Sequence, residues 1–183
     1  FTSAIIKWTL QRFHIIIDLK MICIYNGPIF AVFSTILAYL FGQLFDEKVQ
    51  NDSNSKKKKK SNISTLGCFF SALIAFIPGL ISRSVAGSYD YESMSIFVLN
   101  ASIYFFCYAL KHGSLIAAML SGLVYGYMSL SWGGYVFLSN CIPLFTMGMI
   151  VLGRYSWRLH ITYSVWAVVG SLLSTSVPFI GDK

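Results

Sequence analysis

Two carboxylates, Asp90 and Glu92, stand one residue apart in the polar stretch SRSVAGSYDYE, which covers residues 82–92 and interrupts a strongly apolar sequence. Carboxylate oxygens are the ligands that hard cations such as Mg2+ and Mn2+ prefer, whereas zinc favours nitrogen and sulfur. The same stretch carries one cation, Arg83, ahead of the two acids. The pair is therefore a candidate site for a hard divalent cation.

The spacing of the two acids also fits a purely structural role. Asp90 could cap a helix that starts near residue 91, and Glu92 would then lie in its first turn, where the helix macrodipole favours an acid. Side chains two residues apart diverge on a helix but share one side of an extended segment. Binding of one cation by both acids therefore requires non-helical backbone, and Gly87 would let the loop turn back toward the bundle. The spacing alone does not decide between the cap and the metal site.

The composition places these residues in an integral membrane protein. Of the 183 residues, 56% are hydrophobic and only 11% are charged, whereas a soluble domain carries about 25% charged residues. Apolar runs of the length that crosses a bilayer as a helix, about 17 to 25 residues, predict six spans. These predicted spans are 21–45, 63–81, 93–110, 114–131, 134–152 and 159–180. Because outer-membrane strands would alternate in polarity, we predict an all-α polytopic transmembrane helix bundle.

Residues 1–20 mix apolar and charged positions at roughly helical spacing, which predicts an amphipathic helix at the membrane interface. The transmembrane domain then covers residues 21–183. Within it, the low-complexity run at 48–62 contains adjacent lysines that repel each other and predict a disordered loop. The positive-inside rule puts this loop in the cytosol and the acidic stretch at 82–92 on the luminal side. The net charge of +7 comes largely from the lysine run, so we predict no nucleic-acid surface.

Three segments resemble the catalytic subunit of the eukaryotic oligosaccharyltransferase. That family's second acidic motif is similar to residues 78–97, PGLISRSVAGSYDYESMSIF. Its S-x-W-G-G-Y segment is similar to residues 127–144, YMSLSWGGYVFLSNCIPL. The following turn and span are similar to residues 153–181, GRYSWRLHITYSVWAVVGSLLSTSVPFIG. The likeness covers most of the chain downstream of residue 63.

The resemblance implies a GT-C type membrane glycosyltransferase of the endoplasmic reticulum. This family transfers an oligosaccharide from a dolichyl diphosphate carrier to the Asn side chain of N-x-Ser/Thr sequons on the luminal face. By the match, Asp90 and Glu92 would be ligands of Mn2+ or Mg2+ and would act in catalysis through that ion. Arg83 would neutralise these acids or contact the lipid-linked phosphate. Trp132 would line the donor pocket or serve as an interfacial anchor beside a tight turn. The implied partners are the donor lipid, an acceptor polypeptide, the lipid bilayer and other oligosaccharyltransferase subunits.

The match leaves parts of the family's machinery unaccounted for. The sequence has no first-loop acidic motif, no later-loop acid and no W-W-D-Y-G motif, so we expect an internal piece of a longer chain that is inactive alone. Tyr91 stands where the family usually has Asn between the two acids. Two other classes remain as alternatives. A non-catalytic structural subunit fits the hydropathy but leaves the motifs unexplained, and a transporter would need charges deep within the predicted spans, which have none.

Overall fold

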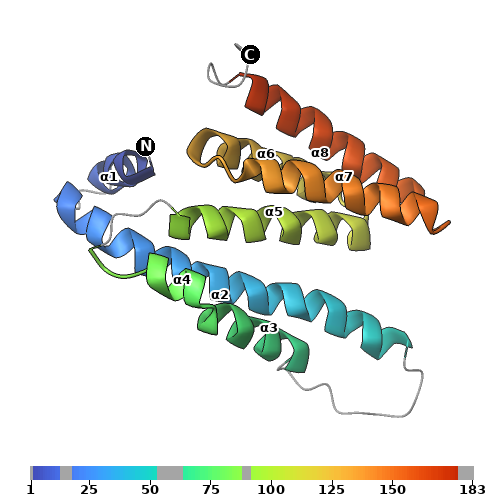
Figure 1. Cartoon of the computed structure of the whole chain (residues 1–183), viewed down its shortest axis with the longest axis horizontal. Coiled ribbons are helices and arrows are strands. Elements are labelled where there is room, and N and C mark those ends of the chain that lie inside the picture. The colour runs from blue at the N-terminus through green and yellow to red at the C-terminus, as the bar shows by residue number, and fades with distance from the viewer. Residues whose placement is uncertain (1, 13–17, 53–63, 88–91, 177–183) are drawn as a thin grey trace. The chain divides into compact units, whose positions relative to one another are not determined.

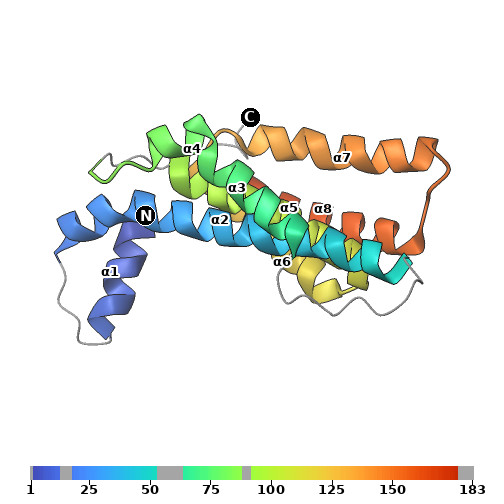
Figure 2. The same ribbon diagram turned by 90° about the horizontal axis from the view of Figure 1, so that it is seen from below.

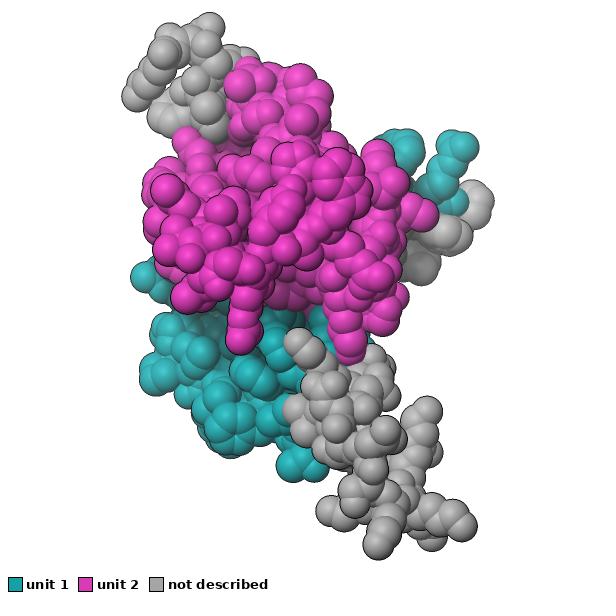
Figure 3. Space-filling view, turned by 90° about the vertical axis from the view of Figure 1, so that its right-hand side faces the viewer, with its two compact units in different colours: residues 1–97 teal, residues 98–183 magenta. Residues whose placement is uncertain are grey.

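The computed structural model describes residues 2–12, 18–52, 64–87 and 92–176, and every regular element within these ranges is an α-helix. The helices, shown in Figure 1, are α1 (Thr2–Arg12), α2 (Leu19–Asp52), α3 (Thr65–Phe76), α4 (Pro78–Arg83), α5 (Glu92–His112), α6 (Leu115–Ser131), α7 (Tyr135–Val151) and α8 (Trp157–Thr175). The predicted all-α helix bundle is therefore confirmed. The chain forms two compact units, residues 1–97 and 98–183, which Figure 3 distinguishes by colour.

The helix lengths bear on how the chain crosses a membrane. Among the described residues, the segments Lys20–Asp46 and Glu92–His112 are long and apolar enough to cross a bilayer. The apolar helices α3, α6 and α7 are shorter, at 12, 17 and 17 residues. A helix of 17 residues is about 26 Å long, slightly less than the roughly 30 Å of a hydrocarbon core. α6 and α7 therefore match the lower end of the predicted span length, whereas α3 is too short to cross a hydrocarbon core as a straight helix.

In the first unit, α3 packs along α2, and Figure 1 and Figure 2 both show the two helices side by side. Ser34, Ala38 and Gly42 recur at four-residue intervals on α2 and are all buried. A Cβ atom added to Gly42 would lie 2.6 Å from the Cα of Gly67 in α3, so the two backbones are in contact. Small residues at such intervals permit close helix packing in membranes. Ser64 caps α3 by accepting a 2.9 Å hydrogen bond from the N–H of Gly67.

Two helix boundaries in this unit correct the prediction. The span predicted at 63–81 is broken at Ile77, because a residue before a proline is driven out of the helical region; Ile77 has φ −64° and ψ 118°, and Pro78 starts α4. The loop predicted at 48–62 starts later, since α2 continues to Asp52 through residues with good intrinsic helix propensity, among them Glu, Lys and Gln. The rest of that loop lies outside the described residues.

The N-terminal helix is also shorter than the predicted amphipathic segment. α1 ends at Arg12 and α2 begins at Leu19, whereas the prediction extended one interfacial helix over residues 1–20. Residues 13–17 lie outside the described part of the chain. The position of α1 at a membrane interface stays a prediction.

In the second unit, α6 packs closely against α8 through glycines. A Cβ atom on Gly126 would lie 2.6 Å from side-chain carbons of Leu173. On the facing helix, a Cβ atom on Gly170 would lie 2.6 Å from the ring of Tyr125. The ring of Tyr125 in turn lies 5.0 Å, centroid to centroid, from that of the buried Trp166. Large side chains of each helix thus fill the space that glycines leave on the other.

The break predicted between the spans at 93–110 and 114–131 is confirmed. α5 ends at His112, Gly113 has φ +68°, and Ser114 caps α6 by accepting a hydrogen bond from the N–H of Ala117. Deeper in the unit, the hydroxyl of Ser121 donates to the carbonyl of Ser102 at 2.8 Å, and the hydroxyl of Ser102 donates back at 3.2 Å. These reciprocal bonds satisfy two buried hydroxyls and link α5 to α6.

Candidate functional site

Helix α4 brings Arg83 to the start of the loop that leads to α5. Pro78 occupies the first turn of this six-residue helix, where its missing N–H costs no hydrogen bond. Leu80 is buried and anchors α4 within the first unit. After Ser84 ends the helix, Gly87 adopts φ +92°, a backbone conformation that glycine reaches without the steric cost other residues meet. The reversal expected at Gly87 is therefore present.

The loop between α4 and α5 is closed by an ion pair. The Nε atom of Arg83 lies 3.1 Å from the Oε2 atom of Glu92. The two side chains are 50% and 29% exposed, so water screens the pair and it stabilises the fold by only about 0.2 to 1 kcal/mol. The structure thus shows Arg83 and Glu92 together, as the neutralising interpretation of Arg83 requires. A contact between Arg83 and a substrate phosphate stays a prediction.

The first turn of α5 places a carboxylate at the positive end of a helix. The described part of α5 begins at Glu92, close to the predicted helix start near residue 91, and its N-terminal N–H groups favour a nearby anion. Asp90 lies outside the described residues, so neither its cap nor its metal-ligand interpretation is tested. Glu92 itself is helical, as the capping interpretation predicts, and the non-helical backbone that joint cation binding requires is not tested at Asp90 and Tyr91, which lie outside the described residues.

The described residues include one of the two predicted metal ligands, Glu92. No group of three or more His, Cys, Asp and Glu side chains with ligand geometry occurs within the described ranges. Glu92 offers hard carboxylate oxygens, which suit Mg2+ or Mn2+, although Arg83 engages one of them. Mg2+ takes about six oxygen ligands, so Asp90, a substrate or other parts of the protein would have to provide the others. The ligand chemistry fits a hard cation, and the ligand set is incomplete.

Trp132 lies in the second unit, at the end of α6. Its backbone is extended, with φ −152° and ψ 134°, and its carbonyl accepts a 3.3 Å hydrogen bond from the N–H of Tyr135. A Cβ atom added to Gly134 would clash with the Trp132 ring, whereas one added to Gly133 would meet nothing within 4 Å. The ring therefore packs on the backbone of a tight turn. This geometry accounts for the W-G-G segment structurally, and a role of Trp132 in donor binding stays a prediction.

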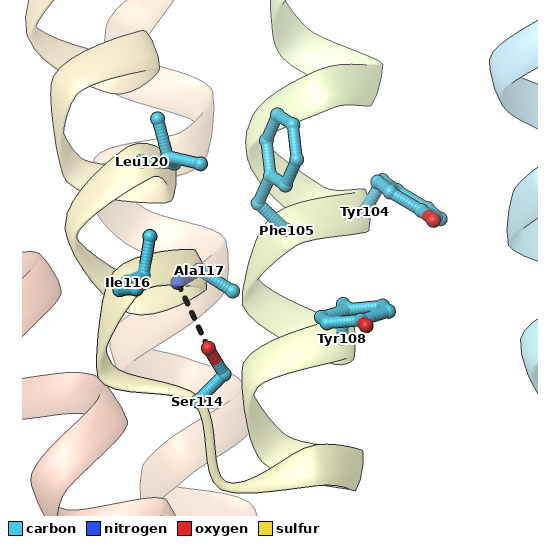
Figure 4. A pocket seen from close by; sticks show the side chains of 7 residues that line it. All are labelled: Tyr104, Phe105, Tyr108, Ser114, Ile116, Ala117 and Leu120. Atoms are coloured by element: carbon cyan, nitrogen blue, oxygen red, sulfur yellow. Dashed lines mark hydrogen bonds between the residues drawn. The ribbon is translucent and has the colours of Figure 1, made fainter.

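A groove of about 360 Å³ lies between α5 and α6 in the second unit. Figure 4 shows Tyr104, Phe105 and Tyr108 on one wall and Ile116 and Leu120 on the other. None of the side chains that line it is an acid or a base, and the hydroxyl of Ser114 is used to cap α6. The groove therefore offers no carboxylate for a hard cation, and the polar loop before α5 remains the candidate site.

Comparison with known proteins agrees with the three resembling segments. The family model described as "Oligosaccharyl transferase STT3, N-terminal" matches residues 57–183. The dolichyl-diphosphooligosaccharide–protein glycosyltransferase subunit STT3B of Arabidopsis thaliana is 39% identical over 181 residues. The corresponding subunits stt-3 of Caenorhabditis elegans and STT3 of Dictyostelium discoideum are 37% and 36% identical.

Each of these alignments covers 98% of this chain but only 22% or 23% of the relative. The chain thus spans about a fifth of the length of the curated relatives that it matches. The matches nevertheless include both units and the whole loop between α4 and α5. The chain belongs to the STT3 family of oligosaccharyl transferases.

Proposed function

We propose that the complete protein containing this chain transfers an oligosaccharide from a dolichyl diphosphate carrier to the side-chain amide nitrogen of Asn in N-x-Ser/Thr sequons. The observation that supports this most directly is the match to dolichyl-diphosphooligosaccharide–protein glycosyltransferase subunits over 98% of the chain. The match includes the loop that carries both acids. In the reaction, the bond from the sugar to the phosphate oxygen breaks as a bond to the Asn nitrogen forms, the amide nitrogen releases one proton to water, and the lipid diphosphate leaves.

In this proposal, Asp90 and Glu92 hold Mn2+ or Mg2+ on the side of the membrane where transfer occurs. When bound, the cation neutralises charge on the departing diphosphate. Glu92 contributes a carboxylate whose position is set by the first turn of α5 and by the ion pair with Arg83. Arg83 is thereby a positioning residue, because an ordered carboxylate loses less conformational entropy when it binds a cation.

The proposal places the protein in the endoplasmic reticulum membrane, with the loop before α5 luminal and the lysine-rich segment cytosolic. The apolar helices support a place in a membrane, and the positive-inside rule supports this orientation. Single cysteines at Ala86 and Lys57, in a full-length background without other accessible cysteines, provide a test with a membrane-impermeant maleimide. In sealed microsomes, the reagent should label the cysteine at position 57 from outside. It should reach the one at position 86 only after permeabilisation, and the reverse pattern would invert the topology.

The catalytic proposal is tested by glycosylation of a sequon reporter in cells that depend on the full-length protein. Asp90→Ala and Glu92→Ala, at matched protein levels, should each lower transfer by about tenfold or more, since each removes a ligand of the cation. Asp46→Ala removes an acid near the other end of α2 and serves as the matched control, which should keep wild-type transfer. Unchanged transfer in the Asp90 and Glu92 variants would favour the alternative of a non-catalytic structural subunit.

A further inference from the structure

Helix α2 has a backbone carbonyl that its own helix cannot satisfy. Pro28 lies in the interior of α2 and has no N–H, so the carbonyl of Ile24, four residues earlier, lacks its usual intrahelical donor. The N–H of Gly87 donates to this carbonyl instead, with a nitrogen–oxygen distance of 3.4 Å. A residue of the loop before α5 thus completes the hydrogen bonding of α2 at the position that the proline leaves open.

The neighbouring residue Gly27 brings the same loop close to α2. Gly27 is buried, and a Cβ atom added to it would lie 3.4 Å from the carbonyl oxygen of Ser84 and 3.5 Å from its Cα. An alanine would therefore just fit, whereas a larger side chain would push the backbone at Ser84 away from α2. Gly27 and Pro28 together form a seat on α2 for the backbone of residues 84–87, and we call these two residues the Gly-Pro seat.

The Gly-Pro seat contacts residues 84–87, the part of the loop that precedes Asp90 and Glu92. The φ of +92° at Gly87 sets the direction of the chain beyond the N–H that bonds to Ile24, and L-residues with a Cβ rarely adopt that conformation. From Gly87 the sequence reaches Asp90 in three residues, and a chain extends at most about 3.6 Å per residue. A contact that fixes the position of Gly87 therefore limits how far Asp90 can lie from it. On the other side of the loop, the Arg83–Glu92 ion pair fixes the second acid.

We propose that Gly27 and Pro28 are positioning residues for the cation site, because they hold residues 84–87, which lead to Asp90 and Glu92 in the sequence, against α2. This inference rests on the proposed function, in which these acids bind Mn2+ or Mg2+. A hydrogen bond of this kind changes the population of the seated loop by about threefold to tenfold. When only a fraction of molecules has the binding-competent loop, the apparent dissociation constant for the cation rises by the inverse of that fraction. Loss of the seat therefore raises the Mn2+ requirement and leaves transfer at saturating Mn2+ close to wild type.

The test is a Mn2+ titration of the full-length protein with two readouts: oligosaccharide transfer to a sequon peptide in chelator-washed microsomes, and direct Mn2+ binding to the purified protein, measured by the electron paramagnetic resonance signal of free Mn2+. Pro28→Ala restores an N–H that bonds to Ile24 within the helix and therefore competes with the hydrogen bond from Gly87. It should raise the half-maximal Mn2+ concentration by about threefold or more without lowering the protein level. Pro143→Ala is the matched control, since Pro143 also lies inside a helix, α7, and no backbone N–H from the described loops donates to the carbonyl of Ser139. This control should titrate as wild type.

Further variants at Gly87 and Gly27 test whether the higher Mn2+ requirement arises from loss of the contact with the Gly-Pro seat. Gly87→Ala should raise the Mn2+ requirement as Pro28→Ala does, and the double variant should equal the larger single effect because both break one contact. Gly27→Leu should also raise the requirement, whereas Gly27→Ala should not, which keeps the test decisive if Pro28→Ala alters folding. A wild-type Mn2+ requirement in Pro28→Ala and Gly27→Leu, or single effects that multiply in the double variant, would overturn the inference.

Glu92→Gln, measured in the same titration, distinguishes a failure of the seat inference from a failure of the cation site itself. If Glu92→Gln loses transfer while the seat variants titrate as wild type, the seat inference alone fails. If Glu92→Gln retains wild-type transfer and Mn2+ dependence, the cation site itself fails, and the seat inference falls with it.

Discussion

Replacing Gly42 with alanine should loosen the α2–α3 contact that supports the first unit. The new Cβ atom would lie 2.6 Å from the Cα of Gly67, 2.7 Å from its N and 2.7 Å from the carbonyl oxygen of Leu66. All three neighbours are backbone atoms, so no side-chain rotation can relieve the clash. Carbon atoms pack best at about 3.5 to 4.0 Å, and the helices must therefore separate by roughly 1 Å. Overpacking of this kind costs about 1 to 3 kcal/mol.

Gly148→Ala in α7 is the matched control. A Cβ atom there meets nothing within 4 Å, so the substitution brings only the gain in helix propensity, about 1 kcal/mol. Gly42→Ala receives the same gain, and the difference in unfolding free energy between the two variants isolates the overpacking cost. The assay is the midpoint of SDS-induced unfolding of the purified full-length protein in mixed micelles, where Gly42→Ala should unfold at lower SDS than Gly148→Ala. Equal midpoints would show that α2 and α3 do not touch backbone to backbone.

Two other substitutions test the surroundings of the predicted site residues. Gly134→Ala should displace the Trp132 ring and shift tryptophan fluorescence, whereas Gly133→Ala should leave the spectrum unchanged; the same spectrum for both would contradict the packing of the ring on the turn. Arg83→Gln should leave the protein level unchanged, because its ion pair with Glu92 is half exposed and contributes about 1 kcal/mol or less. If Arg83 only positions Glu92, the same variant should keep the wild-type KM for the lipid-linked donor, and a rise of about tenfold or more would instead assign Arg83 to phosphate binding.

Much of the fold follows from hydropathy, because long apolar runs in this sequence form helices. The break at Gly113 was also predictable, since glycine next to a charged residue interrupts the apolar run there. The split at Ile77 was missed although its cause, Pro78, is visible in the sequence, because the apolar run continues across it. The end of α2 was missed for the opposite reason. The apolar run ends near residue 45, but α2 continues to Asp52 because the residues that follow have good helix propensity.

The residue types of the candidate site could be predicted from the sequence, but the contacts with α2 that hold the loop could not. The proximity of Arg83 to Glu92 follows from a loop that turns back, and Gly87 signalled that turn. The seat on α2 was not found, although a proline inside a span always leaves a carbonyl four residues earlier without its helical donor. Which N–H fills that gap depends on tertiary contacts between segments about sixty residues apart, and no local pattern specifies them.

The central claim is that Asp90 and Glu92 bind the cation that assists glycosyl transfer, and the Mn2+ dependence of a Glu92→Gln variant tests it most directly. Glutamine keeps the size of the side chain and an oxygen that accepts a hydrogen bond from Arg83, but it removes the negative charge that attracts a divalent ion. In purified full-length protein with lipid-linked donor and sequon peptide, the account predicts transfer reduced by about tenfold or more at low Mn2+, with partial recovery as Mn2+ is raised. Wild-type transfer and an unchanged Mn2+ requirement would contradict it and leave Glu92 as a residue that starts a helix.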